Sequence, residues 1–202
     1  MNPRYITANV IERRIRTPVI NVIYPSVFGL PNEAVQDEIN TLIESIVRGM
    51  MTAQDSTNPE LGEMVGIYSV ELNEKSLLSI RFENFAIMKM AANGTTLLAA
   101  LTVDLQTGEV YTLNDLFLKD TPYRVRLNRI IEAQIRSQDM PLIGEFPGVT
   151  DRQGFYLTPT ALVIFFPELE FTPHFVGPPE FVIPYKRIAG IINPRGPIGR
   201  LQ

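Results

Sequence analysis

The stretch that decides the fold is residues 32–51, NEAVQDEINTLIESIVRGMM. Its apolar side chains recur at helical spacing, and its charged side chains fall off that stripe. Asn32 is a good N-cap residue, and Glu33 is well placed against the positive end of a helix dipole. We therefore predict an amphipathic core helix from Asn32 to Met51. The residues expected to be buried against a sheet are Val35, Leu42, Ile43 and Ile46.

Alternating polar and apolar residues on both sides of this helix predict strands. Before it, residues 5–16 and 19–24 alternate with period two, which is typical of paired strands, and Pro25, Gly29 and Pro31 then break the chain. After it, a polar loop leads into a meander. The strands expected there are residues 65–72, 77–87, 97–105 and 110–113.

Two glycine turns are expected within the meander. Asn93-Gly94 is a favoured two-residue hairpin turn, because both residues tolerate positive φ. Thr107-Gly108 turns the chain again, and Gly108 is expected at positive φ, where a Cβ is costly.

The rest of the chain predicts a second helix and short strands. Asn114 caps a short turn that Leu116 and Phe117 anchor to the core, and a helix follows over residues 122–137. The final third is rich in proline, which confines strands to edges or short lengths. The strands expected in it are 155–157, 161–166 and 181–183.

Together these elements predict an α+β fold, an antiparallel or mixed sheet meander with two main helices packed on one face. We expect residues 1–60 to form an N-terminal lobe of strands plus helix. Residues 61–192 would hold the meander, the second helix and the C-terminal strands, with both lobes sharing one core. The tail 193–202 contains two prolines and two glycines, and we expect it to be mobile.

Composition excludes several functions. The chain has 202 residues and a net charge of −4, without a clustered basic surface for nucleic acid. It has no cysteine, which excludes disulfides, thiolate catalysis and iron–sulfur clusters. No stretch approaches the roughly 20 apolar residues of a membrane span, and the N-terminus lacks the apolar core of a signal peptide. We expect a cytoplasmic protein if the chain is complete, or else one whose export signal has been removed.

Candidate catalytic residues are few. His174 is the single histidine, so a Ser–His–acid triad has one available base, and a structural histidine is the favoured interpretation. The carboxylates considered for acid–base chemistry are Asp104, Asp115, Glu168 and Glu170. Asp115 is better explained by a helix dipole, and Glu168 and Glu170 by a solvated strand face. We expect no catalytic residue, no cofactor and no metal site.

Three stretches nevertheless resemble a known family. They are Tyr24 to Asn40, with its Tyr-Pro and Gly-Leu pairs; Leu101 to Phe117, LTVDLQTGEVYTLNDLF; and Phe155 to Tyr185. In combination they resemble a bacterial domain of unknown function. That domain is seen in the ectodomain of the lysozyme-binding anti-sigma-V factor. A similar module lies in the non-catalytic N-terminal region of a peptidoglycan N-acetylmuramic acid deacetylase.

The resemblance implies an α+β binding or sensing module that is not an enzyme. It implies a protein partner such as lysozyme, or a cell-wall glycan, and relatives are usually extracytoplasmic. Family members commonly carry Ala-His-Gly before the long strand, whereas this chain has Ala92-Asn93-Gly94, so the family histidine is absent. The sigma-binding segment and the membrane helix of the anti-sigma factor are also absent.

Three hypotheses of function follow: a non-catalytic binding module, a carboxylate-based hydrolase, and a structural protein that forms a homo-oligomer through residues 86–90 and 97–101. The first is favoured. Its contacts are expected in the loops around residues 91–95 and 171–179, where an apolar surface would carry one polar group. The candidate ligand contacts are Asn93, Gly94, Phe171, His174 and Phe175.

Overall fold

The computed structural model describes residues 5–202, and the chain forms two compact units, Met1–Val110 and Tyr111–Gln202. The boundaries expected from the sequence lay after residues 60 and 192 instead. No boundary falls near residue 60, because the helix before it and the strands after it share one apolar core. The expected α+β class is confirmed, and each unit has its own sheet and its own main helix.

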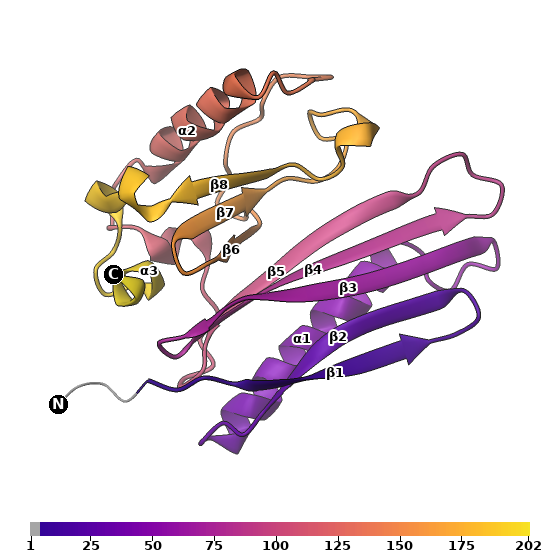
Figure 1. The fold of residues 1–202 in the computed structure, drawn as a ribbon, viewed down its shortest axis with the longest axis horizontal. Helices are drawn as coiled ribbons and strands as arrows, with labels where there is room; N and C mark the ends of the chain where they lie inside the picture. The colour runs from indigo at the N-terminus through magenta and orange to yellow at the C-terminus, as the bar shows by residue number, and fades with distance from the viewer. Residues whose placement is uncertain (1–4) are drawn as a thin grey trace. The chain divides into compact units, whose positions relative to one another are not determined.

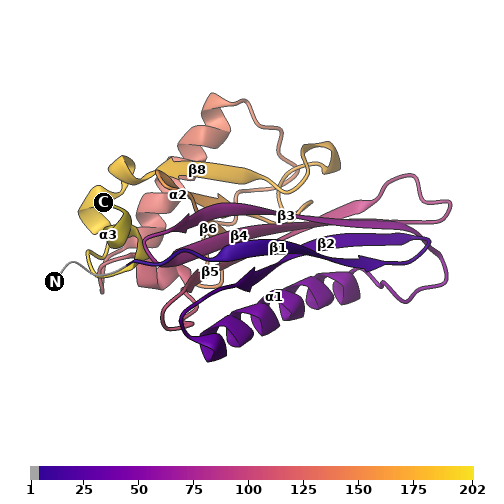
Figure 2. The ribbon, with the colours of Figure 1, turned by 60° about the horizontal axis from the view of Figure 1, so that its bottom comes forward.

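Unit 1 is a five-stranded sheet with α1 lying across one face (Figures 1 and 2). The strands follow the order β1-β2-β3-β4-β5, and all neighbours are antiparallel except β2 and β3. The elements are β1 (Asn9–Arg16), β2 (Ile20–Phe28), α1 (Glu33–Ala53), β3 (Leu61–Glu74), β4 (Leu77–Met88) and β5 (Thr95–Asp104). The parallel pair arises because α1 connects β2 to β3 as a crossover.

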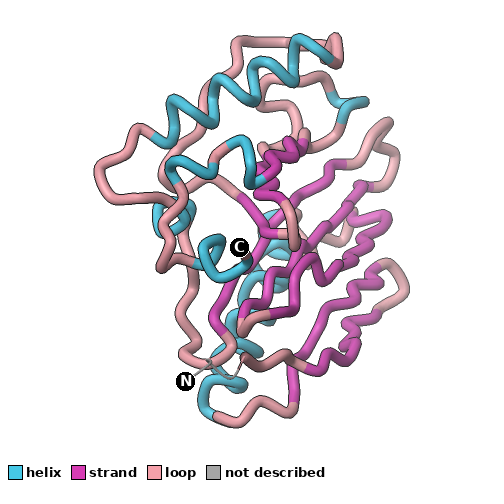
Figure 3. Tube along the Cα trace, turned by 60° about the vertical axis from the view of Figure 1, so that its left-hand side comes forward, coloured by secondary structure: helices cyan, strands magenta, loops and turns pink. Residues whose placement is uncertain are grey.

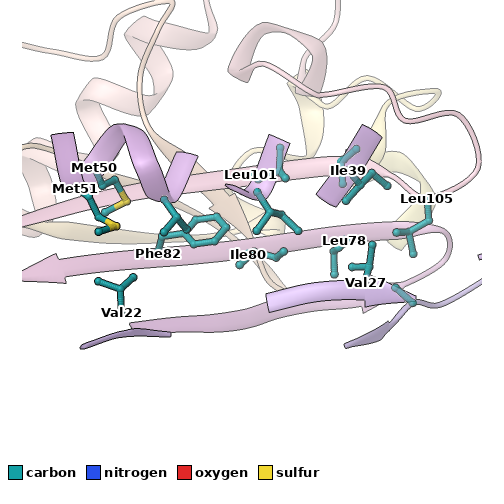
Figure 4. Packing of buried hydrophobic residues seen from close by; sticks show 14 of the residues in the cluster. Val22, Val27, Ile39, Met50, Met51, Leu78, Ile80, Phe82, Leu101 and Leu105 are labelled. Atoms are coloured by element: carbon teal, nitrogen blue, oxygen red, sulfur yellow. The ribbon is translucent and has the colours of Figure 1, made fainter. Parts of the chain in front are cut away.

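The predicted core helix is confirmed. The Asn32 side chain accepts hydrogen bonds from the backbone N–H groups of Ala34 and Val35, at 3.1 and 3.4 Å. Figure 4 shows Ile39, Met50 and Met51 of α1 in one apolar cluster with side chains of the sheet. Ile39 and Ile43 are fully buried. Leu42 and Ile46 were expected to be buried too, but they lie at the edge of the stripe and are half-buried.

Two strand predictions in unit 1 were wrong. β2 does not stop at Pro25 but continues through it to Phe28, with Pro25 opposite Glu12 of β1. Proline is tolerated there because β2 pairs with β3 only over Ile20–Val22, so no ladder partner on that side needs the missing N–H. The expected strand over residues 110–113 is reduced to one bridge between Val103 and Val110.

Unit 2 contains a three-stranded antiparallel sheet of order β6-β7-β8, with α2 against it (Figure 3). Its elements are η1 (Leu113–Leu116), α2 (Tyr123–Ser137), β6 (Phe155–Leu157), β7 (Ala161–Phe165), η2 (His174–Val176), β8 (Glu180–Pro184), η3 (Tyr185–Arg187), η4 (Ala189–Ile191) and α3 (Pro197–Leu201). The edge strand β8 is tied to α2, because Nε2 of Gln134 donates to the Val182 carbonyl at 2.9 Å.

Aromatic stacking fixes the start of unit 2. The Phe117 ring, buried as predicted, lies parallel to the Tyr123 ring with centroids 4.6 Å apart. The Tyr123 hydroxyl donates to Oδ1 of Asp151 at 3.1 Å. Burial, with support from this hydrogen bond, raises the pKa of Tyr123 above its ordinary value.

The C-terminal residues, which were expected to form a mobile tail, pack against the rest of unit 2. Residues 197–201 fold as α3, in which Pro197 and Ile198 are buried. The Asn193 N–H donates to the Leu116 carbonyl at 2.9 Å, and the Arg200 guanidinium donates to the Tyr111 hydroxyl. The glycines and prolines thus shape a packed turn. In the described part of the chain, no helix is both long enough and apolar enough to cross a membrane.

We expect Ile43→Ala to destabilise the protein by about 2–5 kcal/mol, because it removes buried methyl groups and leaves a cavity under α1. Leu42→Ala, at a half-buried position on the same helix, should cost less than about 2 kcal/mol. Urea unfolding of both variants measures the difference. Equal losses would contradict the orientation of α1 described here.

We also expect two glycine substitutions to act in opposite directions. Gly108 has φ +78°, as predicted, and an added Cβ would lie 2.9 Å from Oε2 of Glu38, so Gly108→Ala should destabilise by about 1–2 kcal/mol. Gly49 lies inside α1 with open space around it, so Gly49→Ala should stabilise by about 1 kcal/mol. Thermal melts of the two variants should shift in opposite directions from the parent chain.

Candidate functional site

The five candidate contact residues belong to two loops in different units, and each loop is described by itself. Asn93 and Gly94 lie in unit 1, in the connection between β4 and β5. Phe171, His174 and Phe175 lie in unit 2, in the segment that joins β7 to β8. We call this second segment, residues 166–179, the β7–β8 loop.

The β4–β5 connection is longer than the two-residue turn predicted from Asn93-Gly94. Pairing of the two strands ends at Ala86 and Thr95, and the tight bend lies earlier, where the Ala91 N–H donates to the Met88 carbonyl. Gly94 is buried and does not have positive φ. A larger residue would not fit at this position, because an added Cβ would lie 2.3 Å from the Phe85 ring. Asn93 is exposed, beside this constrained glycine.

The β7–β8 loop rests on a cluster of aromatic rings. Phe171 is fully buried and meets Phe146 and Phe166 edge-on, with centroids 5.5 and 5.3 Å apart. Phe166 in turn meets Phe181 edge-on at 5.8 Å. Edge-to-face pairs of this kind add to the stabilisation from burial. Phe171 is therefore the anchor of the loop in the core, and its ring is not available to a ligand.

A buried carboxylate orients the single histidine. The side chain of Glu168 is only 7% exposed, and its Oε1 contacts Nδ1 of His174. The prediction that Glu168 lies on a solvated strand face was wrong, because the residue follows the end of β7 and its side chain is enclosed by the loop. The imidazole keeps 38% exposure.

Phe175 is the most exposed aromatic residue of the loop. Its side chain is 80% exposed, although it lies next to His174 within the short helix η2. Hydrogen bonds hold this turn on both sides: Val176 N–H donates to Pro173 O and Gly177 N–H to His174 O, each at 3.0 Å. Gly177, at φ +70°, then reverses the chain into β8. The loop thus presents an apolar ring beside an imidazole of fixed orientation.

Asp104 and Asp115, two of the other carboxylates considered for catalysis, have structural partners. Oδ1 of Asp104 accepts the backbone N–H groups of Gln106 and Thr107, at 2.7 and 3.0 Å, and so closes the turn that leads to Gly108. Asp115 closes a capping box with Thr112, accepting from its N–H at 2.7 Å. No three His, Asp or Glu side chains within residues 5–202 are grouped to hold a metal ion.

The sequence indicated His174 and Phe175 as candidate contacts but did not indicate that Glu168 contacts His174. Six positions separate Glu168 from His174 in a proline-rich loop, where no helical or strand periodicity relates two side chains. The one signal available was the presence of an acid near the single histidine. It does not distinguish a buried pair from two solvated groups.

These observations define a class: an α+β protein of two units, with a ring-bearing loop held by a buried carboxylate. Residues 114–186 match the model of a family described as "Protein of unknown function (DUF3298)". The matched segment runs from η1 to η3 and lies entirely within unit 2. It confirms the likeness to a domain of unknown function.

Two solved structures share the fold over nearly the whole chain. One is a crystal structure of a member of the DUF3298 family from Bacteroides fragilis, with 14% identity, a TM-score of 0.66 and coverage of 96% of both chains. The other is a DUF3298 family protein from Pseudomonas aeruginosa, with 14% identity, a TM-score of 0.68 and coverage of 99% of this chain and 97% of that one. Among curated proteins no match is found.

We expect the two loop phenylalanines to differ sharply in their effect on stability. Phe171→Ala should cost about 3–5 kcal/mol, because it removes the fully buried ring that anchors the loop. Phe175→Ala should change stability by less than about 0.5 kcal/mol, because its ring is exposed. Urea unfolding monitored by circular dichroism compares the two. A large loss in Phe175→Ala would place that ring in the core and contradict the description above.

Proposed function

We propose that this chain is a non-catalytic binding module whose ligand is a protein or a cell-wall glycan. The β7–β8 loop would contact that ligand. The observation that carries the proposal is the 80% exposed Phe175 ring beside His174, on a loop fixed from beneath by Glu168 and Phe171. An exposed aromatic ring with an adjacent polar group suits both the stacking of a sugar and the core of a protein interface.

Rigidity of the loop supports the same proposal. Four prolines, at positions 167, 173, 178 and 179, restrict its backbone, and the aromatic cluster holds its underside. A surface that is already ordered loses little conformational entropy when a ligand binds. Phe175 is thus exposed without the flexibility that usually accompanies exposure.

The family likeness supports the choice of ligands. The chain resembles the ectodomain of the anti-sigma-V factor, which binds lysozyme, and a non-catalytic region of a peptidoglycan deacetylase. The net charge of −4 would also favour encounter with a cationic protein. Asn93, where the family commonly has histidine, belongs to the other loop and is proposed as a secondary contact only.

The test is a titration of the labelled chain with lysozyme and, separately, with solubilised peptidoglycan fragments. We expect one ligand to shift the backbone amides of residues 172–177. Phe175→Ala should weaken that binding at least about tenfold, a loss typical of an interfacial aromatic. Val182→Ala is the matched control, because Val182 is an exposed apolar residue of unit 2 outside the loop, and it should bind as the parent chain does.

The same titration separates the alternatives. Release of cleaved fragments would favour the hydrolase hypothesis. An unchanged affinity of Phe175→Ala would remove the loop from the contact. Binding of neither ligand would contradict the proposed function, and a rise in molecular mass with concentration would favour the homo-oligomer instead.

A further inference from the structure

A second surface of unit 2 has a chemistry of its own. It is a groove of about 320 Å³ between the first two turns of α2 and the segment that follows β8. Three arginines and an apolar wall line it, and we call it the arginine groove. Its main lining residues are Val125, Arg126, Arg129, Arg187, Ile188 and Ile191.

Helical spacing places one side of the groove. Pro122, Val125, Arg126 and Arg129 stand at positions i, i+3, i+4 and i+7, so they share one face of α2. The buried residues of the helix, such as Leu127 and Ile131, lie on a different face. One face of the amphipathic helix therefore packs in the core, and the other face carries the arginines.

A hydrogen bond holds the other side of the groove, the segment after β8, close to α2. Nη2 of Arg126 donates to the carbonyl oxygen of Arg187 at 3.0 Å, which holds η3 against α2. Ile188 is almost fully buried beneath the groove, and Val125 is half exposed at its wall. The floor and wall are thus apolar, and Arg126, Arg129 and Arg187 complete the lining.

The arginines of the groove differ from their neighbours on α2 in charge pairing. The neighbouring arginines of α2 have acidic partners: Arg124 contacts Asp151 at 3.1 Å, and Arg136 contacts Glu132 at 4.0 Å. Among residues 5–202, by contrast, no carboxylate pairs with Arg126, Arg129 or Arg187. Three positively charged residues line one hollow in a protein whose net charge is −4, and the positive potential there favours an anion.

We propose that the arginine groove binds a small organic oxyanion, a carboxylate or a phosphate that carries an apolar group. Guanidinium groups match both oxyanions through paired N–H donors, and the apolar wall accommodates the remainder of the ligand. The volume lies at the lower end of small-molecule sites, which fits a ligand of about the size of one substituted ring.

This site is separate from the one proposed for the module's function. The β7–β8 loop precedes β8, and Arg187 follows it within η3, so the two sites lie at opposite ends of that strand (Figure 1). Phe175→Ala should therefore leave anion binding unchanged, and loss of anion binding says nothing against the loop.

The experiment titrates the labelled full chain with phenyl phosphate, benzoate and the neutral benzyl alcohol at constant ionic strength. We expect saturable amide shifts in residues 122–129 and 187–191 with at least one of the two anions, and none with the alcohol. A higher affinity for phenyl phosphate than for benzoate would assign a phosphate ligand. A higher affinity for benzoate would assign a carboxylate ligand. Added salt should weaken binding, since the arginines are exposed.

Variants localise the site. Arg129→Gln and Arg187→Gln should each weaken anion binding about tenfold, because each removes a charged hydrogen-bond donor. Arg136→Gln is the matched control: it makes the same change in net charge on the same helix, and it should bind as the parent chain does. Both groove variants alter exposed side chains, and thermal melts check that they fold.

Three outcomes would overturn the proposal. They are absence of saturable shifts with both anions, an equal response to benzyl alcohol, and equal weakening by Arg136→Gln and the groove variants.

Discussion

Burial of one helical stripe is the constraint on which unit 1 depends. α1 is amphipathic and cannot remain in water with Ile39 and Ile43 exposed, so it must lie on a sheet. The chain enters the helix from β2 and leaves it into β3, and a crossover of this kind returns the next strand parallel to the first. The remaining strands then extend the sheet by antiparallel hairpins. The mixed sheet therefore follows from the position of a single helix in the sequence.

Polar groups inside unit 1 are arranged to satisfy this packing. Ser76 is fully buried at φ +60°, and its N–H and Oγ both bond to the backbone of Ile6, while its carbonyl accepts from Leu105. Asn84, also buried, donates to Gln54 at 2.7 Å, and Gln54 donates to the Thr95 carbonyl at 2.8 Å. These bonds join the N-terminal segment and the end of α1 to the sheet. They also pair buried donors that would destabilise the fold if they had no partner.

Periodicity predicted the elements better than it predicted the turns or the site. Asn32 capped the helix as expected, since a cap depends on neighbouring residues alone. Asn93-Gly94 failed as a hairpin turn because packing on the Phe85 ring, a tertiary contact, decides the backbone there. The left-handed residue of that connection is instead Met90, at φ +59°, where no glycine signals a turn. In the candidate site, exposure separates Phe171 from Phe175, and no local pattern distinguishes the two rings.

The architecture of unit 2 explains why the two surfaces proposed for ligand binding lie at strand ends. Every residue of β6 and β7 is buried, so those strands have no face to offer a ligand. The edge of β8 is occupied in part by the bond from Gln134. The side chains proposed to contact a ligand therefore come from the connections and from the outer face of α2. A connection serves recognition only if it is held in place, and buried groups supply that support: Glu168 and Phe171 beneath one end, Ile188 beneath the other.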